Sequence, residues 1–303
     1  MNLKKQLYQI LKCPICNGGK FTNHGTVNGI HPDLLKLCKL LECKNCKHWF
    51  LSKMPKKKFI ENLYKKSSEY VFNKEFISNI KKKTFFTKAL KSEKLNINHW
   101  IFKFMEDYKK GNYLEIGPGN CNLLKTFRKF GWYCEGLELQ KIFRIRGVHT
   151  DIKKISKKNK NVLVFHDVLE HVVDPISVLR KFSKQQTAGD KLFLAFPNSS
   201  SFKAQLLKTK WSMVAPLAHL NFFSINSTKI LLKECGYHPY LIEETSFVVF
   251  KKLLRSIIRL PVTFLLDVLN LRIICALKRI PEIILNILDL IKGDQLHVIG
   301  IKR

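Results

Sequence analysis

The chain has 303 residues, 46% of them hydrophobic, which suits one large folded domain with a substantial core and a smaller appendage. Its nine cysteines follow an N-terminal stretch without the apolar segment of a secretory leader, so we expect a cytoplasmic protein and exclude a disulfide framework. The formal net charge of +31 suits a nucleic-acid or anionic membrane partner, although AT-rich coding, which favours lysine, would also produce it.

Two C-x-x-C pairs lie in the N-terminal part, Cys13 with Cys16 and Cys43 with Cys46. Two short knuckles of this kind can direct four thiolates at one tetrahedral ion, which predicts a structural zinc ribbon over residues 1–55. Four thiolates close the coordination sphere, so the metal would contribute folding energy and no chemistry. A redox role for either pair is one alternative. Other residues that could replace a cysteine ligand are Cys38, His24, His31 and His48.

Residues 56–108 are polar and lysine-rich, with apolar residues at helix-like spacing, for example Phe72, Phe76 and Ile80. This spacing predicts two or three helices that lead into the first strand of the next domain. We interpret the segment as a helical linker or lid.

Residues 112–140 contain a strand, a glycine-rich turn, a helix and a second strand. Gly117 and Gly119 form the turn, and the second strand ends at Glu138. Glycines let the backbone turn sharply and approach a ligand, with the amides of the helix N-terminus facing it. An acid about 20 residues after the first glycine suits a ribose diol. The candidate ligands are a dinucleotide and S-adenosylmethionine, and an ordinary turn without a ligand is the third alternative.

Two residues decide between the cofactors. Asn122 stands where a dinucleotide site has its third glycine, and the carboxylate of Glu115 suits a cationic cofactor better than a pyrophosphate. The stretch resembles motif I of the class I S-adenosylmethionine-dependent methyltransferases, E-x-G-x-G-x-G, with Cys121 in place of the third glycine. This replacement could narrow the space beside the methionine part of the cofactor.

A short strand at 148–150 precedes Asp151, and an apolar strand at 162–165 precedes His166 and Asp167. Such an apolar strand suits a sheet buried on both faces, which binds ligands at the carboxyl ends of its strands. The run DVLEHVVDP, residues 167–175, resembles the same element of the ubiquinone-biosynthesis-like branch (type 11/23) of these methyltransferases. The family places an acid at Asp151 near the adenine amino group, although a solvated loop aspartate is the alternative. The cofactor-binding residues that the resemblance implies are Glu115, Gly117, Gly119, Asn120, Glu138, Asp151 and Asp167.

The later part of the chain bears on the acceptor. Phe196-Pro197-Asn198 differs from N/D-P-P-F/Y, the motif with which amino-methylating enzymes hold an exocyclic nitrogen, and this disfavours adenine or glutamine N-methylation. The run HLNFFS, which begins at His219 and precedes a helix at 227–234, resembles the ubiquinone-biosynthesis-like branch again. It also resembles sugar C-methyltransferases, which carry an N-terminal zinc module. Ala218 replaces their glutamate, so their ketosugar deprotonation is not expected.

The segment 248–292 is apolar with regularly placed cations, and its isoleucines and leucines at spacings of three and four predict amphipathic helices broken at Pro281. It holds no uncharged run near the roughly 18 residues that span a bilayer. It could lie on an anionic membrane surface, which would make the protein peripheral at the inner face of the membrane. Packing against the domain or a second subunit is the alternative. Residues 294–302 predict a last strand after this insertion.

Together these features predict an α/β protein with a Rossmann-like, seven-stranded class I methyltransferase sheet over residues 109–303, its last strand antiparallel. The resemblance implies methyl transfer to a small-molecule or saccharide acceptor, such as a nucleotide sugar or a lipid-linked glycan, by O- or C-methylation. An RNA methyltransferase that uses the ribbon and the basic surface as its platform is the second hypothesis, and a binding protein without catalysis is the third. The sequence does not indicate an oligomeric state. Candidates for the general base, each with a structural role as its alternative, are His219, His171 and His166.

Overall fold

The computed structural model describes residues 3–27, 38–66, 100–105, 109–139, 145–245 and 293–303. Of the predicted helical segment 56–108, the structure describes a helix at Lys57–Lys66 and a 3-10 turn at Trp100–Phe104, and residues 67–99 lie outside the described ranges. The predicted insertion at 248–292 lies outside them as well. Within the described ranges, no helix has both the length and the apolar character needed to cross a membrane.

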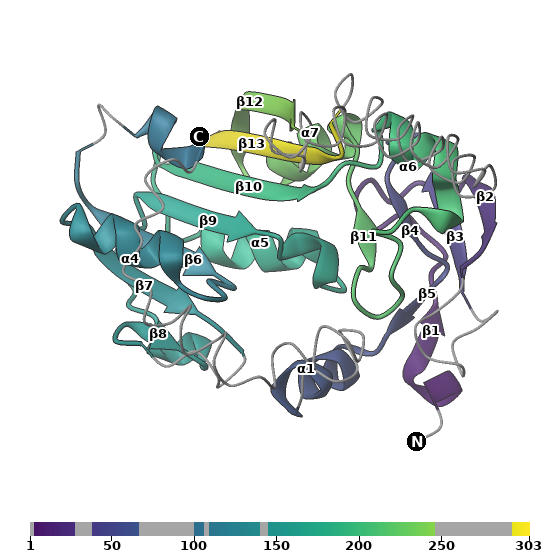
Figure 1. The fold of residues 1–303 in the computed structure, drawn as a ribbon, viewed down its shortest axis with the longest axis horizontal. Helices are drawn as coiled ribbons and strands as arrows, with labels where there is room; N and C mark the ends of the chain where they lie inside the picture. Colours follow the sequence, from purple (N-terminus) through teal and green to yellow (C-terminus); the bar gives the residue numbers. More distant parts are fainter. Residues whose placement is uncertain (1–2, 28–37, 67–99, 106–108, 140–144, 246–292) are drawn as a thin grey trace, which may run out of the picture.

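The main sheet has seven strands in the order β12-β13-β10-β9-β6-β7-β8. The five strands from β6 to β10 run parallel, and β13 runs antiparallel to both of its neighbours, which confirms the predicted topology. In the sequence, the predicted insertion therefore falls between β12 and β13, two strands that pair with each other (Figure 1). The strands are β6 (Asn112–Ile116), β7 (Tyr133–Leu137), β8 (Val148–His149), β9 (Val162–His166), β10 (Lys191–Pro197), β12 (Tyr237–Thr245) and β13 (Gln295–Lys302).

Helices cover both faces of this sheet, and the apolar strand β9 shows why it needs them. Val162 and Val164 pack in the core beneath α4, whereas Leu163 and Phe165 pack in the core beneath α5 and α7. Alternate residues of a strand point to opposite faces, so the part of β9 that is covered on both sides, residues 162–165, is apolar throughout. The α-helices are α1 (Lys57–Lys66), α4 (Asn122–Lys129), α5 (Pro175–Ser183), α6 (Phe202–Leu207) and α7 (Ile225–Glu234). The 3-10 turns are η1 (Leu3–Gln6), η3 (Trp100–Phe104), η4 (Ile152–Lys154), η5 (Leu169–His171) and η6 (Lys208–Lys210).

Helix boundaries follow their caps. α5 begins at Pro175, because the Asp174 carboxylate accepts a hydrogen bond from the Ser177 amide. α7 begins two residues before the predicted start, because Ser224 and Ser227 form a capping box. These caps fix the loops that lead into both helices, and those loops carry the histidines discussed below.

The cysteine module builds its sheet with a strand of the large domain. Its strands β2 (Phe21–Thr26), β3 (Lys39–Cys43) and β4 (Trp49–Leu51) continue into β11 (Asn221–Phe222), in the order β11-β4-β3-β2. The strands β1 (Leu7–Gln9) and β5 (Lys53–Pro55) form a separate pair. One apolar core runs through the module and the α5–α7 side of the main sheet. In Figure 1 the module lies beyond the carboxyl ends of β9 and β10, next to β11.

Candidate functional site

The turn between β6 and α4 needs its glycines for two different reasons. Gly117 has a φ of 65°, and a Cβ there would lie 2.7 Å from Cγ2 of Val168. Gly119 has a φ of 49°, but a Cβ there would meet nothing within 4 Å. The first glycine therefore lets two segments pack together, and the second faces open space that a ligand can approach.

Cys121 takes the left-handed conformation, with a φ of 60°, which explains why the family motif has glycine at this position. Its buried thiol packs with Tyr113 and Leu124 in the core beneath α4 and donates to the carbonyl of Gly119 at 3.4 Å. Burial raises the pKa of this thiol to about 12, so it remains protonated. The side chain of Asn120 is exposed and accepts a hydrogen bond from the Asn122 amide at 3.1 Å.

The three predicted acids around the turn have different environments. Glu138 follows β7, and its Oε2 accepts a hydrogen bond from the Gly119 amide at 3.3 Å. Glu115 is only 4% exposed and accepts a hydrogen bond from the Tyr113 hydroxyl at 2.9 Å. Burial raises the pKa of Glu115 to about 7. Asp151 is exposed and caps η4 through the Lys153 amide, which suits its alternative role as a loop residue.

A second group of polar residues follows β9. Asp167 has a φ of 54°, an unfavourable conformation for a residue with a side chain. Its carboxylate contacts His166 Nδ1 at 3.1 Å and accepts a hydrogen bond from Gln295 Nε2 at 3.1 Å. Burial by itself lowers the pKa of His166, but the hydrogen bond with Asp167 and the negative charge of Asp167 outweigh it, so the pKa of His166 is raised above its usual value. The strained backbone therefore holds a carboxylate at the carboxyl end of the sheet.

His171 and His219 come from separate loops and meet with their ring centres 4.7 Å apart. Nδ1 of His171 lies 2.7 Å from the Ala218 carbonyl, and Nδ1 of His219 lies 2.7 Å from the Met213 carbonyl. A carbonyl only accepts hydrogen bonds, so the Nδ1 atom that faces it carries a proton in each ring, and a neutral His219 has its basic lone pair on Nε2. Burial lowers the pKa of His171. The pKa of His219 is lowered to about 4, first by burial and then by the positive charge that His171 would carry when protonated.

Glu170 joins this pair, and our sequence reasoning did not select it. The side chain is 1% exposed, with Oε1 3.8 Å from His171 Nε2, and Oε2 has no hydrogen-bond partner in the described part of the chain. Burial and the charge of Asp167 raise its pKa well above the usual range. Atoms of Glu170, His171 and His219 lie within 4.8 Å of one another, so the cluster brings together donor types that bind divalent metals.

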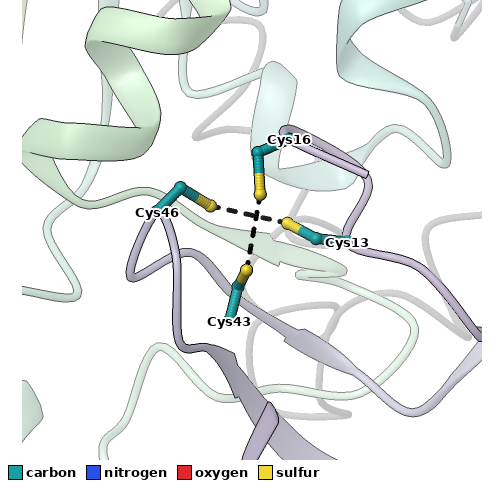
Figure 2. Close-up of side chains that lie close together, drawn as sticks. All are labelled: Cys13, Cys16, Cys43 and Cys46. Carbon is teal, nitrogen blue, oxygen red and sulfur yellow. Dashed lines mark hydrogen bonds between the residues drawn. The ribbon is translucent and has the colours of Figure 1, made fainter. Parts of the chain in front are cut away.

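The four predicted cysteines converge from the two knuckles, as Figure 2 shows. Cys13 Sγ lies 3.5 Å from Cys46 Sγ, and Cys16 Sγ lies 3.4 Å from Cys43 Sγ. Zinc–sulfur bonds of about 2.3 Å would place tetrahedral sulfurs about 3.8 Å apart, so a small outward shift would admit the ion. The four sulfurs therefore have the number, chemistry and spacing that a zinc ion requires.

The fold and the glycine turn define the class of protein. A mostly parallel sheet with a glycine turn after β6, and an acid after β7 that contacts this turn, is a Rossmann-like domain for a nucleotide-containing cofactor. A family model described as a methyltransferase domain matches residues 86–241, which is more than half of the chain. The protein therefore belongs to this family and is an S-adenosylmethionine-dependent methyltransferase.

Solved structures with a similar fold are methyltransferases as well. A methyltransferase from Archaeoglobus fulgidus is 13% identical, with 76% of this chain and 100% of that chain covered and a TM-score of 0.47. A phosphoethanolamine N-methyltransferase from Haemonchus contortus is 13% identical, with 97% and 71% covered and a TM-score of 0.47. A possible histamine N-methyltransferase from Thermotoga maritima is 13% identical, with 76% and 97% covered and a TM-score of 0.43. No curated protein matches the sequence.

Proposed function

We propose that the protein transfers the methyl group of S-adenosylmethionine to a hydroxyl oxygen, or to an acidic carbon, of a small-molecule or saccharide acceptor. The observation that best supports this proposal is the pair His171 and His219, which lies in the loops near the carboxyl end of the sheet. Nδ1 of each ring lies 2.7 Å from a backbone carbonyl, which fixes the orientation of both rings. The proposed cofactor contacts are Gly117, Gly119, Asn120, Glu115, Glu138, Asp151 and Asp167.

When bound, the cofactor supplies an electrophilic methyl group, which leaves its sulfur as a neutral thioether. The protein's task is to align the acceptor and to remove its proton. Alignment contributes up to ~7–11 kcal/mol in small-molecule systems, and a positioned base adds roughly 10²–10⁴ in rate. Nε2 of His219 or His171 would take the proton, with His166 as the third candidate. The negative charge of Asp167 favours the protonated form of both rings of the pair.

The test is methyl transfer from S-adenosylmethionine labelled in its methyl group to three acceptor sets: nucleotide sugars, lipid-linked oligosaccharides and bulk transfer RNA. We expect a labelled product in one of the first two sets. His219→Gln or His171→Gln should reduce its formation roughly 10²–10⁴-fold, with unchanged affinity for adenosylhomocysteine. The matched control is His238→Gln, which changes an exposed histidine of β12. Wild-type rates in both site variants would refute the assignment of the base.

The second candidate is an RNA methyltransferase, and it is favoured by the net charge of +31. Labelling of transfer RNA alone in the same assay would establish it and refute the small-molecule proposal. The proposed contact of residues 248–292 with a membrane is tested by sedimentation with vesicles. Binding to anionic but not to neutral vesicles, lost as salt rises, is the expected result.

We also propose that Cys13, Cys16, Cys43 and Cys46 hold one zinc ion. Their sulfur spacing and their convergence from two C-x-x-C knuckles support this proposal. Four thiolates would complete a tetrahedral site, so the ion would be structural and would not meet the substrate.

A further inference from the structure

Residues 218–221 connect the cysteine module to the loop that carries His171. On one side, β11 pairs with β4 of the module, with Asn221 opposite Phe50. On the other side, three hydrogen bonds join residues 218–221 to 170–172. They run from His171 Nδ1 to the Ala218 carbonyl at 2.7 Å, from the Leu220 amide to the Glu170 carbonyl at 2.7 Å, and from Asn221 Nδ2 to the Val172 carbonyl at 2.6 Å.

Asn221 is the residue that contacts both partners through its side chain. While Nδ2 donates to Val172, Oδ1 accepts a hydrogen bond from His48 Nε2 at 3.1 Å. His48 and Asn221 are both fully buried, and the His48 ring packs against Phe50 and Phe223. A carboxamide can donate and accept at the same time, which an aliphatic or acidic side chain of this size cannot do.

The segment that follows β11 is attached to the second cysteine knuckle as well. Ser224 Oγ, the cap of α7, donates to the carbonyl of Cys46 at 2.9 Å. His48 follows Cys46 by two residues, so a change in the knuckle displaces the donor that Asn221 uses. Well-packed interiors transmit such displacements because they have no free space to absorb them.

We propose that Asn221 is a positioning residue through which the cysteine module sets the orientation of His171. The inference rests on the proposed function insofar as His171 faces the acceptor. It implies that the occupancy of the cysteine site controls the geometry of the acceptor side of the active site, while the cofactor-binding turn stays as it is.

The test is nuclear magnetic resonance of the full chain, labelled with ¹⁵N at the histidine rings and saturated with adenosylhomocysteine. In the wild type we expect His171 to be the Nδ1–H tautomer. Asn221→Leu, which removes both side-chain hydrogen bonds, should shift the tautomer ratio about fivefold towards Nε2–H, the change expected when one net hydrogen bond is lost. His48→Leu should do the same, and His48→Gln, whose amide can still donate, should restore the wild-type signal.

The matched control is His24→Leu, which removes a histidine of the same module and its hydrogen bond with Glu42 but leaves His48 and Asn221 in place; it should keep the wild-type His171 signal. Chelation of the metal, which should unfold the module and remove the His48 donor, should shift His171 of the wild type in the same direction as Asn221→Leu does. Wild-type His171 signals in folded Asn221→Leu, or in the chelated wild type, would overturn the proposal. If Asn221→Leu does not fold, the pair His48→Leu and His48→Gln decides alone. No acceptor is needed, so this result is independent of the methyl-transfer assay.

Discussion

Glu138 offers the sharpest test of the cofactor site. In the free protein its carboxylate already holds the amide of Gly119, and in the proposed complex it also accepts hydrogen bonds from the ribose hydroxyls. Hydrogen bonds to a charged group contribute about 1.5–3 kcal/mol. Glu138→Ala should therefore raise the dissociation constant of adenosylhomocysteine about 10- to 150-fold, because each 1.4 kcal/mol is a factor of ten.

Isothermal titration calorimetry measures this change directly. Glu138→Gln keeps an oxygen that can accept from Gly119 but loses the charge, so its effect should be smaller than that of alanine. The control is Glu234→Gln, which makes the same change of charge at a half-exposed side chain of α7. Wild-type affinity in Glu138→Ala would show that the acid at the end of β7 does not bind the ribose, and the assignment of the site would then be wrong.

Three further predictions concern the turn, the metal and pH. Cys121→Gly should leave the free energy of unfolding in urea at or near the wild-type value, because glycine adopts the left-handed conformation without strain. Cys121→Val should lower it by more than the ~1–2 kcal/mol of left-handed strain that the cysteine already carries. Equal stability of the two variants would contradict this. Metal analysis should find one zinc ion per chain. A structural zinc contributes about 10–16 kcal/mol, so chelation should unfold the cysteine module, while adenosylhomocysteine should still bind. A metal-free module that resists protease would refute the structural zinc site. Burial raises the pKa of Glu115 to about 7, above its unfolded value, so the contribution of Glu115 to stability is greatest below pH ~4.5 and falls by about 3 kcal/mol as pH rises through 7. The difference in unfolding free energy between the wild type and Glu115→Gln in urea titrations should therefore change with pH over this range, and a difference that does not change would exclude Glu115 as its source.

Local patterns in the sequence predicted most of the main sheet. The continuous apolar run of β9 and the glycine turn before α4 depend on residues that are neighbours in the chain. The antiparallel last strand was predicted from the family resemblance. The convergence of the four cysteines was also predictable, because each knuckle is short and a metal site accepts few geometries. At the site, the resemblance singled out Glu138, and the structure shows its contact with the turn.

Other features depend on contacts between residues far apart in the sequence. Glu170 lies in the run DVLEHVVDP, residues 167–175, but its burial beside His219 follows from the packing of two loops. The replacement of the third motif glycine by Cys121 does not tell whether the backbone keeps the left-handed conformation there, and the structure shows that it does.

The sequence by itself determined the class of this protein, its cofactor and its cysteine site, because these are written in short runs with their own geometry. Only the tertiary structure decided how the cysteine module and the methyltransferase domain are joined. β11 has just two residues, too few for a recognisable strand pattern, and its partner β4 lies in the N-terminal module. The hydrogen bond between His48 and Asn221 spans 173 positions of the chain. Such a pairing depends on the shapes of two surfaces that exist only after each part has folded.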